Sequence, residues 1–252
     1  MRWLLSNLKN KAAFAARNPA YAVKSLVREV AHSDERFLSL ITGCPATEIR
    51  RFLNEPLDTP EFADALRSAQ PELASAHVYA ADLYAKKILV QYIALRAFKP
   101  DVVVETGIAS GVSSSYLLLA LHKNARGRLY SVDIGDTSYL PPGRPNGWVV
   151  PDWLRSRWEM RLGDSRHLLP ELLAELGSTD VFIHDSLHTY EHMLWEFRAA
   201  YPYIRPGGLL FCDDALWNAA WPEFVAETRA PLHDVLRGVG FLQKPAGNGA
   251  AA

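Results

Sequence analysis

This sequence has no excess of basic over acidic residues, few cysteines and no long apolar run. Each of these features argues against a class of protein. The 252 residues hold 27 Lys and Arg against 28 Asp and Glu, which gives a net charge of −1. A general nucleic-acid binder carries a basic excess, so we expect no nucleic-acid partner. No apolar run reaches the ~18 residues that span a bilayer. The start also lacks the continuous apolar stretch of a signal peptide, and we expect a cytoplasmic protein.

Only two cysteines are present, Cys44 and Cys212, and they lie far apart in the sequence. They form neither a CxxC pair nor a zinc-knuckle pattern, so the sequence predicts reduced thiols. The apolar content of 49% and the charged content of 22% are ordinary for a globular chain. At this length the chain can bury a sizeable core, either as one large domain or as a domain with an added segment.

The hydrophobic pattern changes near residue 101. Before it, apolar residues recur at helical spacing, as in TEIRRFL, and prolines at 45, 56, 60 and 71 punctuate the segment. After it, short β-branched runs alternate with helical patterns. The helix SSSYLLLALHKN is expected to be capped by its serines, and RPGG is expected to form a turn. The runs expected to be strands are DVVVETG, RLYSVDIG, RWEMRLGDS, TDVFIHD and LLFCDD.

This alternation predicts an α/β fold, a Rossmann-like, doubly wound, mostly parallel sheet with an N-terminal helical segment. We place the helical segment at residues 1–84, the sheet domain at residues 85–246 and a disordered tail at residues 247–252. After residue 214, PEFVAETRA is expected to be helical and VLRGVGFLQK to hold one or two short strands.

The first 28 residues are basic and carry no acidic side chain. Apolar residues lie between the basic ones, so the segment could lie as an amphipathic helix on an anionic membrane. Its many alanines suit close packing on the domain or on a second subunit instead, and we prefer this interpretation. We therefore expect a homo-oligomer and keep peripheral membrane contact as the alternative.

Carboxylates stand at the end of every expected strand. Ligands of open α/β sheets bind beyond the carboxyl ends of the strands, so these side chains are candidates for one common site. A single carboxylate in such a loop is often a cap or a solvated turn, but five sets at one edge favour a function. The residues concerned are Glu105, Asp133, Asp164, Asp185, Asp213 and Asp214.

The first strand end has the chemistry of a nucleoside site. Gly107 and Gly111 allow a sharp turn and a close approach to a ligand, but their spacing is not the G-x-G-x-x-G of dinucleotide sites, which disfavours NAD. Asp133 suits the two hydroxyls of a ribose, and Glu105 can accept a hydrogen bond from an ammonium group. S-adenosylmethionine is a nucleoside that carries positive charge and no phosphate.

The order ETGIASG, SVDIG, GDS and FIHDSLHTYEH, followed by RPGGLLFCDD, resembles a class I S-adenosylmethionine-dependent methyltransferase over about residues 85–216. It is most similar to the metal-dependent sugar O-methyltransferases of macrolide tailoring, with D-x-x-H-x-Y after the fourth strand. The resemblance implies that Asp133 holds the ribose and that Asp164 and Ser165 border the adenine. The residues implied around the methionine part are Glu105, Gly107, Ser110 and Gly111. It also implies that Asp185, Asp213 and Asp214 bind a metal and that His188 is the general base.

The residue types support a metal site on their own. Three carboxylates without a thiolate make a hard site suited to Mg²⁺ or Mn²⁺. Such an ion can chelate two adjacent hydroxyls of a sugar or polyol and lower the pKa of the one to be methylated. His188 could then take the proton at neutral pH, although a capping or packing role for it is also open.

Three other functions are considered. A catechol-like phenol could take the place of the sugar at the same metal. HTYEH, from His188 to His192, matches the H-x-x-E-H pattern of zinc peptidases, but that hypothesis leaves Glu105 and Asp133 unexplained. Glu191 and His192 are then interpreted as the first turn of a surface helix. A non-catalytic domain that keeps only the nucleoside pocket is the third alternative.

The segment of residues 136–158 is long and rich in proline, glycine and aromatic side chains. Long loops in compact domains are commonly functional, so a lid over a ring-shaped acceptor is one interpretation, and simple packing onto the domain is the other. Trp217 and Trp221, which follow the aspartate pair, could form a further wall of an acceptor site. The small-molecule or glycoside acceptor itself is not named by these residues.

Overall fold

The computed structural model describes residues 34–75 and 86–246, and within them one seven-stranded sheet organises the chain. Its strand order is β3-β2-β1-β4-β5-β7-β6. The first five strands are parallel, and β7 runs antiparallel to both β5 and β6. The strands are β1 Val102–Thr106, β2 Arg128–Asp133, β3 Trp158–Leu162, β4 Thr179–His184, β5 Ile204–Cys212, β6 His233–Leu236 and β7 Val239–Gln243.

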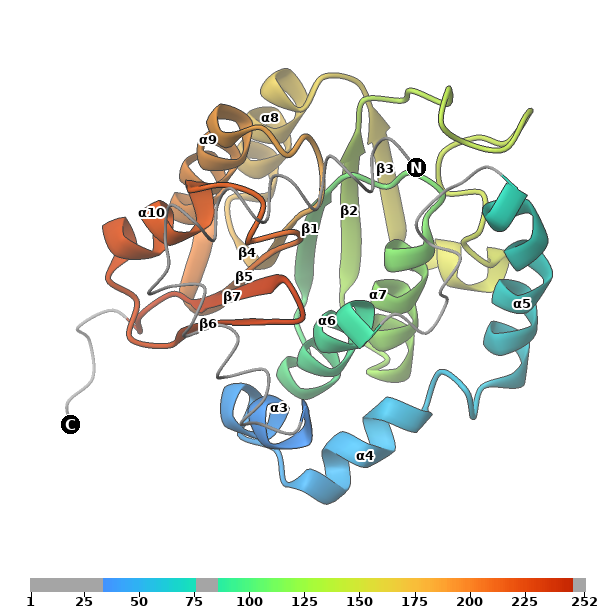
Figure 1. Ribbon diagram of the computed structural model, residues 1–252, viewed down its shortest axis with the longest axis horizontal. Coiled ribbons are helices and arrows are strands. Elements are labelled where there is room, and N and C mark those ends of the chain that lie inside the picture. The colour runs from blue at the N-terminus through green and yellow to red at the C-terminus, as the bar shows by residue number, and fades with distance from the viewer. Residues whose placement is uncertain (1–33, 76–85, 247–252) are drawn as a thin grey trace.

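Helices cover both faces of this sheet, as Figure 1 shows. Successive strand residues point to opposite faces, so Val103 joins one apolar cluster with α6 and α7, and Val104 joins another with α8, α9 and α10. Short 3-10 turns, η2 Asp152–Arg157 and η3 Tyr201–Tyr203, precede β3 and β5. The helices are α3 Asp34–Thr42, α4 Ala46–Asn54, α5 Pro60–Ser75, α6 Lys86–Phe98, α7 Val112–Lys123, α8 Ser165–Leu176, α9 Tyr190–Ala200 and α10 Ala220–Thr228.

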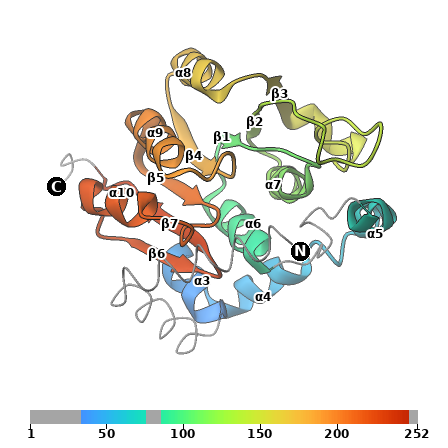
Figure 2. The ribbon, with the colours of Figure 1, turned by 45° about the horizontal axis from the view of Figure 1, so that its top comes forward.

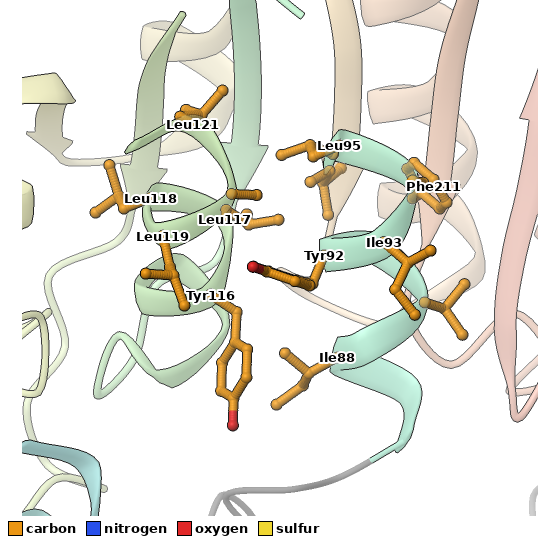
Figure 3. Packing of buried hydrophobic residues seen from close by; sticks show 14 of the residues in the cluster. Ile88, Tyr92, Ile93, Leu95, Tyr116, Leu117, Leu118, Leu119, Leu121 and Phe211 are labelled. Carbon is orange, nitrogen blue, oxygen red and sulfur yellow. The ribbon is translucent and has the colours of Figure 1, made fainter. Parts of the chain in front are cut away.

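Helices α6 and α7 pack side by side through large apolar side chains (Figure 3). Leu117 of α7 is fully buried in this cluster, and Tyr92 meets Tyr116 edge to face with ring centroids 6.3 Å apart. Edge-to-face pairs add about 0.5–1.5 kcal/mol to the burial of the rings. This helix pair backs the strand that carries Glu105.

The N-terminal helices α3, α4 and α5 lie at the periphery of the α6–α7 layer (Figure 2). Just after α4, Glu55 accepts both Nε and Nη2 of Arg96, at 2.6 and 2.9 Å, and the hydroxyl of Tyr92 at 2.8 Å. Burial alone would raise the pKa of Glu55, but these hydrogen bonds hold it below its usual value. Residues 34–75 thus share one core with the sheet.

The predicted α/β class and mostly parallel, Rossmann-like sheet are confirmed. Three local expectations are wrong. Gly111, not a serine, is the N-cap of α7, and Pro71 lies inside α5 rather than at a break. RPGG belongs to β5, where the pairing with β4 changes register. After α10 the chain forms two short strands, within the expected one or two.

Some predictions lie outside the described residues. They concern the basic segment of residues 1–28 and the tail of residues 247–252. The predicted domain boundary at residue 85 also stays a prediction. Within the described residues, no helix is both long and apolar enough to cross a membrane.

Backbone hydrogen bonds extend the sheet one residue beyond its strands, into the loops that carry the predicted site. The amide of Gly107 donates to Val132 O, that of Asp185 to Thr106 O and that of Asp213 to His184 O, each at 2.8 Å. These bonds set the starting points of three loops on one rigid edge. The loop after β1 and the loop after β4 also touch directly, because a Cβ on Gly107 would lie 2.0 Å from the carbonyl oxygen of Asp185.

We expect Gly107→Ala to lower the free energy of unfolding by roughly 2–4 kcal/mol, since the residue has φ +89° and no room for a methyl group. Gly143→Ala is the control, because Gly143 also has a positive φ (+77°) but has nothing within 4 Å of the added Cβ. Urea unfolding of both variants measures the difference. Equal losses of stability in the two would show that the contact with the Asp185 carbonyl does not matter.

Candidate active site

All the predicted site residues lie at the carboxyl edge of the parallel strands or in the loops that leave it. Glu105 is in β1, and residues 107–111, named here the glycine turn, join β1 to α7. Asp133 ends β2, and Asp164 precedes α8. The other residues of the set are Ser165 at the start of α8, Asp185 and His188 between β4 and α9, and Asp213 and Asp214 after β5.

Glu105 points toward α7 and is 1% exposed. Its Oε1 accepts the hydroxyls of Ser114 at 2.5 Å and Ser131 at 2.6 Å. Burial raises the pKa of Glu105 to about 7, the two hydroxyls oppose the rise, and the charge of Asp133 adds to it. A cation bound nearby would therefore favour the ionised form of Glu105.

The glycine turn is shaped by protein contacts. Gly111 has φ +86°, and a Cβ there would lie 2.8 Å from the Cα of Gly147 and 2.9 Å from a methyl carbon of Val150. Both Gly107 and Gly111 are thus required by close packing of the chain on itself. Ser110, in the same turn, is buried, and its hydroxyl has no hydrogen-bond partner among the described residues.

Asp133 anchors the glycine turn to the end of β2. Its Oδ2 accepts the amides of Ile108 at 2.7 Å and Ala109 at 3.0 Å. Its Oδ1 accepts the amide of Gly135 at 2.8 Å and the side-chain amide of Asn146 at 3.2 Å. The sequence indicated the carboxylate but not Asn146, which comes from the long β2–β3 segment and has no recognisable pattern around it.

Two exposed apolar side chains stand beside Asp133. Ile134 is 62% exposed and Leu162, at the end of β3, is 52% exposed. Leu162 is the register partner of Asp133 in the parallel β2–β3 pair, so apolar surface is exposed at this end of the sheet. The sequence offered a weak signal for this surface, an isoleucine directly after the carboxylate in a polar loop. Nearby, Asp164 caps α8 by accepting the amide of Arg166 at 2.9 Å.

Three predicted residues meet at the other side of the site. Asp185, His188 and Asp213 each offer one ligand atom, and these atoms all lie within 4.8 Å of one another. Asp214 is not part of this group, and its backbone is left-handed with φ +49°. Two carboxylates and one imidazole fit a divalent cation of the Mg²⁺ or Mn²⁺ kind, so the donor set is compatible with the predicted metal.

The ring of His188 lies between two other aromatic side chains. Its centroid is 5.3 Å from that of His184 and 5.9 Å from that of Trp217. Its Nε2 is 3.9 Å from an oxygen of Asp185. The half-buried imidazole is thereby held at the edge of the carboxylate pair.

HTYEH does not form a zinc site in the described part of the chain. His192 is absent from the group of possible metal ligands and is only 6% exposed. Its Nε2 lies 2.9 Å from Glu196, one turn further along α9. Glu191 is exposed as expected for a surface helix, but the same expectation for His192 is wrong.

The β2–β3 segment has a buried base and an exposed tip. At the base, the amides of Gly147 and Val149 donate to carbonyls of the glycine turn at 2.9 and 3.0 Å. The tip, residues 142–145, is exposed, and its Arg144 pairs with Glu72 of α5 at 2.6 Å. The base is therefore a structural part of the glycine turn, and the expectation of a lid stays a prediction for the exposed tip alone.

The expected aromatic walls are partly absent. Trp221 is buried in the core, where its ring packs on Phe197 with centroids 5.8 Å apart, so it is not part of an acceptor site. Trp158 begins β3 and donates its indole N–H to Ser131 at 2.8 Å. Tyr139, which is 42% exposed, and Trp217 remain near the site.

The part of the chain that carries these strands matches known proteins. Residues 104–215 match the model of the family described as a methyltransferase domain. The chain is 37% identical over 101 residues to demethylmacrocin O-methyltransferase of Streptomyces fradiae, covering 39% of this chain and 22% of that protein. It is 31% identical over 119 residues to 8-demethyl-8-alpha-L-rhamnosyl tetracenomycin-C 2'-O-methyltransferase of Streptomyces olivaceus, covering 47% of this chain and 28% of that protein.

The chain thus spans about a quarter of the length of the curated relatives it matches. Among solved structures, an O-methyltransferase from Bacillus cereus in complex with SAH aligns with a TM-score of 0.51 at 17% identity, over 71% of this chain and 89% of that one. The fold is therefore similar to that of this solved structure, and residues 104–215 match the methyltransferase domain family model.

Proposed function

We propose that this chain is an S-adenosylmethionine-dependent, divalent-metal-assisted O-methyltransferase that acts on a hydroxyl of a sugar, glycoside or polyol. The observation that carries the proposal is the meeting of Asp185, His188 and Asp213 beside the glycine turn. The proposed metal ligands and the glycine turn, where the cofactor would bind, lie at adjoining strand ends, and this closeness supports methyl transfer between them. The names of both relatives describe O-methylation.

The cofactor side would bind its parts through separate groups. The ammonium group of the methionine part would favour ionised Glu105, and the Ser110 hydroxyl faces no competing partner. Asp133 would hold the ribose by accepting a hydroxyl in place of its longest present bond, the one from the Asn146 side chain at 3.2 Å, while its other oxygen keeps ordering the glycine turn. The adenine would rest on Ile134 and Leu162 near Ser165, because apolar side chains bind the faces of a planar ring.

On the acceptor side, Asp185 and Asp213 would hold the cation, which when bound lowers the pKa of a chelated hydroxyl. Asp214 would act from outside the group of nearest ligand atoms. His188 would take the hydroxyl proton while the oxygen attacks the methyl carbon and the carbon–sulfur bond breaks. The products are the methyl ether and S-adenosylhomocysteine, with the proton left on His188.

The sugar acceptor is preferred over a catechol-like phenol because the name of one relative includes a rhamnosyl group. Around the proposed metal, Leu187 is exposed, and Trp217 lies beside His188. The tip of the β2–β3 segment, with Tyr139 close by, would cover the acceptor. A homo-oligomer stays a prediction, as does the peripheral membrane contact of residues 1–28.

Cofactor binding can be tested by calorimetry. Wild-type protein should bind S-adenosylmethionine and not NAD, and Asp133→Ala should weaken binding by roughly 1.5–3 kcal/mol, the scale of hydrogen bonds to a charged group. Asp136→Ala is the control, since Asp136 is exposed three residues further on and its carboxylate accepts hydrogen bonds from Ser138, not from the glycine turn. Tight binding of NAD alone would reject the assignment.

Metal dependence follows from the same geometry. EDTA should abolish methyl transfer, and Mg²⁺ or Mn²⁺ should restore it. Asp185→Asn and Asp213→Asn should each require much more metal for half-maximal activity, whereas Asp214→Asn should have a smaller effect because it lies outside the close group. Full activity in EDTA, with no divalent ion found by elemental analysis, would contradict the metal site.

The two histidines of HTYEH should separate in function. We expect His188→Ala to lower kcat by roughly 10²–10⁴-fold, the usual contribution of general-base catalysis, while S-adenosylmethionine affinity stays nearly constant. His192→Ala should not remove the base, because its ring faces Glu196 inside the domain. Steady-state kinetics measure kcat for both variants. A wild-type rate in His188→Ala would place the base elsewhere.

A further inference from the structure

A second buried carboxylate lies on the opposite face of β1 from Glu105. Glu196 of α9 is completely buried. Its Oε2 accepts the Thr106 hydroxyl at 2.5 Å and His184 Nδ1 at 2.7 Å. Its Oε1 accepts the Ser186 hydroxyl and His192 Nε2, both at 2.9 Å. Each oxygen thus receives two hydrogen bonds, which is the full capacity of a carboxylate.

The state of this carboxylate follows from its partners. Burial would raise the pKa of Glu196, but the hydrogen bonds from His184 and His192 hold it well below its usual value. Glu196 is therefore an acceptor only, and His184 must carry its proton on Nδ1 to donate. A buried anion of this kind is stable only while its donors stay in place, because an unpaired buried charge is costly.

The four donors surround one loop. Thr106 ends β1, His184 ends β4, Ser186 lies inside the loop, and His192 is in the first turn of α9, where the loop is over. The loop of residues 185–189 contains Asp185 and His188. Its entry, its middle and its exit are therefore all bonded to the same side chain.

A second contact leads from Glu196 to the site. The hydrogen bond to Glu196 fixes the plane of the His184 ring, and this ring packs against that of His188 with centroids 5.3 Å apart. The proposed chemistry uses neither Glu196 nor His184. Outer partners that orient metal-binding groups typically change metal affinity or activity 10–100-fold when they are replaced.

We infer that Glu196 is a positioning residue, which holds the loop so that Asp185 keeps the geometry that binds a divalent cation and His188, the proposed base, stays beside it. The inference rests on the proposed function, because it concerns the same metal group. It differs from a purely stabilising role in one respect. A stabilising group affects whether the domain folds, whereas a positioning group affects how tightly the folded protein binds the metal.

Glu196→Gln tests this difference. The amide has the same size but only one acceptor oxygen, so it can satisfy at most two of the four donors. We expect the folded variant to bind Mn²⁺ about 10–100-fold more weakly, measured as free Mn²⁺ by electron paramagnetic resonance in the full chain without acceptor. Glu191→Gln, an exposed change on the same helix, is the matched control and should bind as the wild type does.

A milder variant keeps the test valid if Glu196→Gln does not fold. Ser186→Ala removes one of the four donors from the loop, and we expect a weakening of Mn²⁺ binding of roughly 2–10-fold, the scale of one hydrogen bond. Thermal unfolding of each variant is recorded alongside. A lower melting temperature with wild-type Mn²⁺ affinity in the folded variants would overturn the inference.

The outcomes also separate the inference from the proposed function. If the wild-type protein binds no Mn²⁺, both are overturned. If the wild type binds Mn²⁺, and both Glu196→Gln and Ser186→Ala bind it equally well, only the positioning role is overturned. Weaker binding in Glu196→Gln with an unchanged Glu191→Gln supports both.

Discussion

The contact between Gly107 and the carbonyl of Asp185 is the constraint on which the rest of the site depends. It sets how closely the loop after β1 approaches the loop after β4, because no side chain separates them. Methyl transfer needs the attacking oxygen, the carbon and the sulfur nearly in line, with reacting atoms about 3–3.5 Å apart. A cofactor on one loop and an acceptor on the other can meet that requirement only if the two loops are fixed to each other. The backbone bonds from Gly107 and Asp185 to the neighbouring strands provide this fixation.

The alternation of side chains along β1 divides the supporting groups between two faces. Glu105 faces α7, and the next residue, Thr106, faces α9 and Glu196. Each face therefore has its own buried carboxylate with its own hydroxyl donors. One lies behind the proposed cofactor pocket and the other behind the proposed metal group. The difference in their partners explains the difference in their acidity, since Glu105 has two hydroxyls and no histidine, while Glu196 has two histidines.

The sequence was sufficient for the succession of strands and helices along the chain and for the residues at the strand ends, because both depend on local periodicity and on a rule about parallel sheets. It was not sufficient for Glu196 or Asn146. Glu196 meets Thr106 across 90 residues, and Asn146 meets Asp133 across 13, in a segment without regular structure. Such pairs depend on which faces of distant elements pack together, and a single sequence carries no period that reports it. Trp221 shows the same limit, because an aromatic next to a site can equally well point into the core.

The division of the β2–β3 segment has a consequence for how this protein could change. Its base shares backbone hydrogen bonds with the glycine turn. Substitutions in the base would therefore disturb the glycine turn, which the proposed reaction needs whatever the acceptor. Its tip is exposed and is tied down chiefly by Arg144, which pairs with Glu72 and stacks on Trp148. Insertions and replacements at the tip would thus leave the glycine turn intact. Under the proposed function, new acceptor preferences would be acquired at the tip, by drift or by loop grafting.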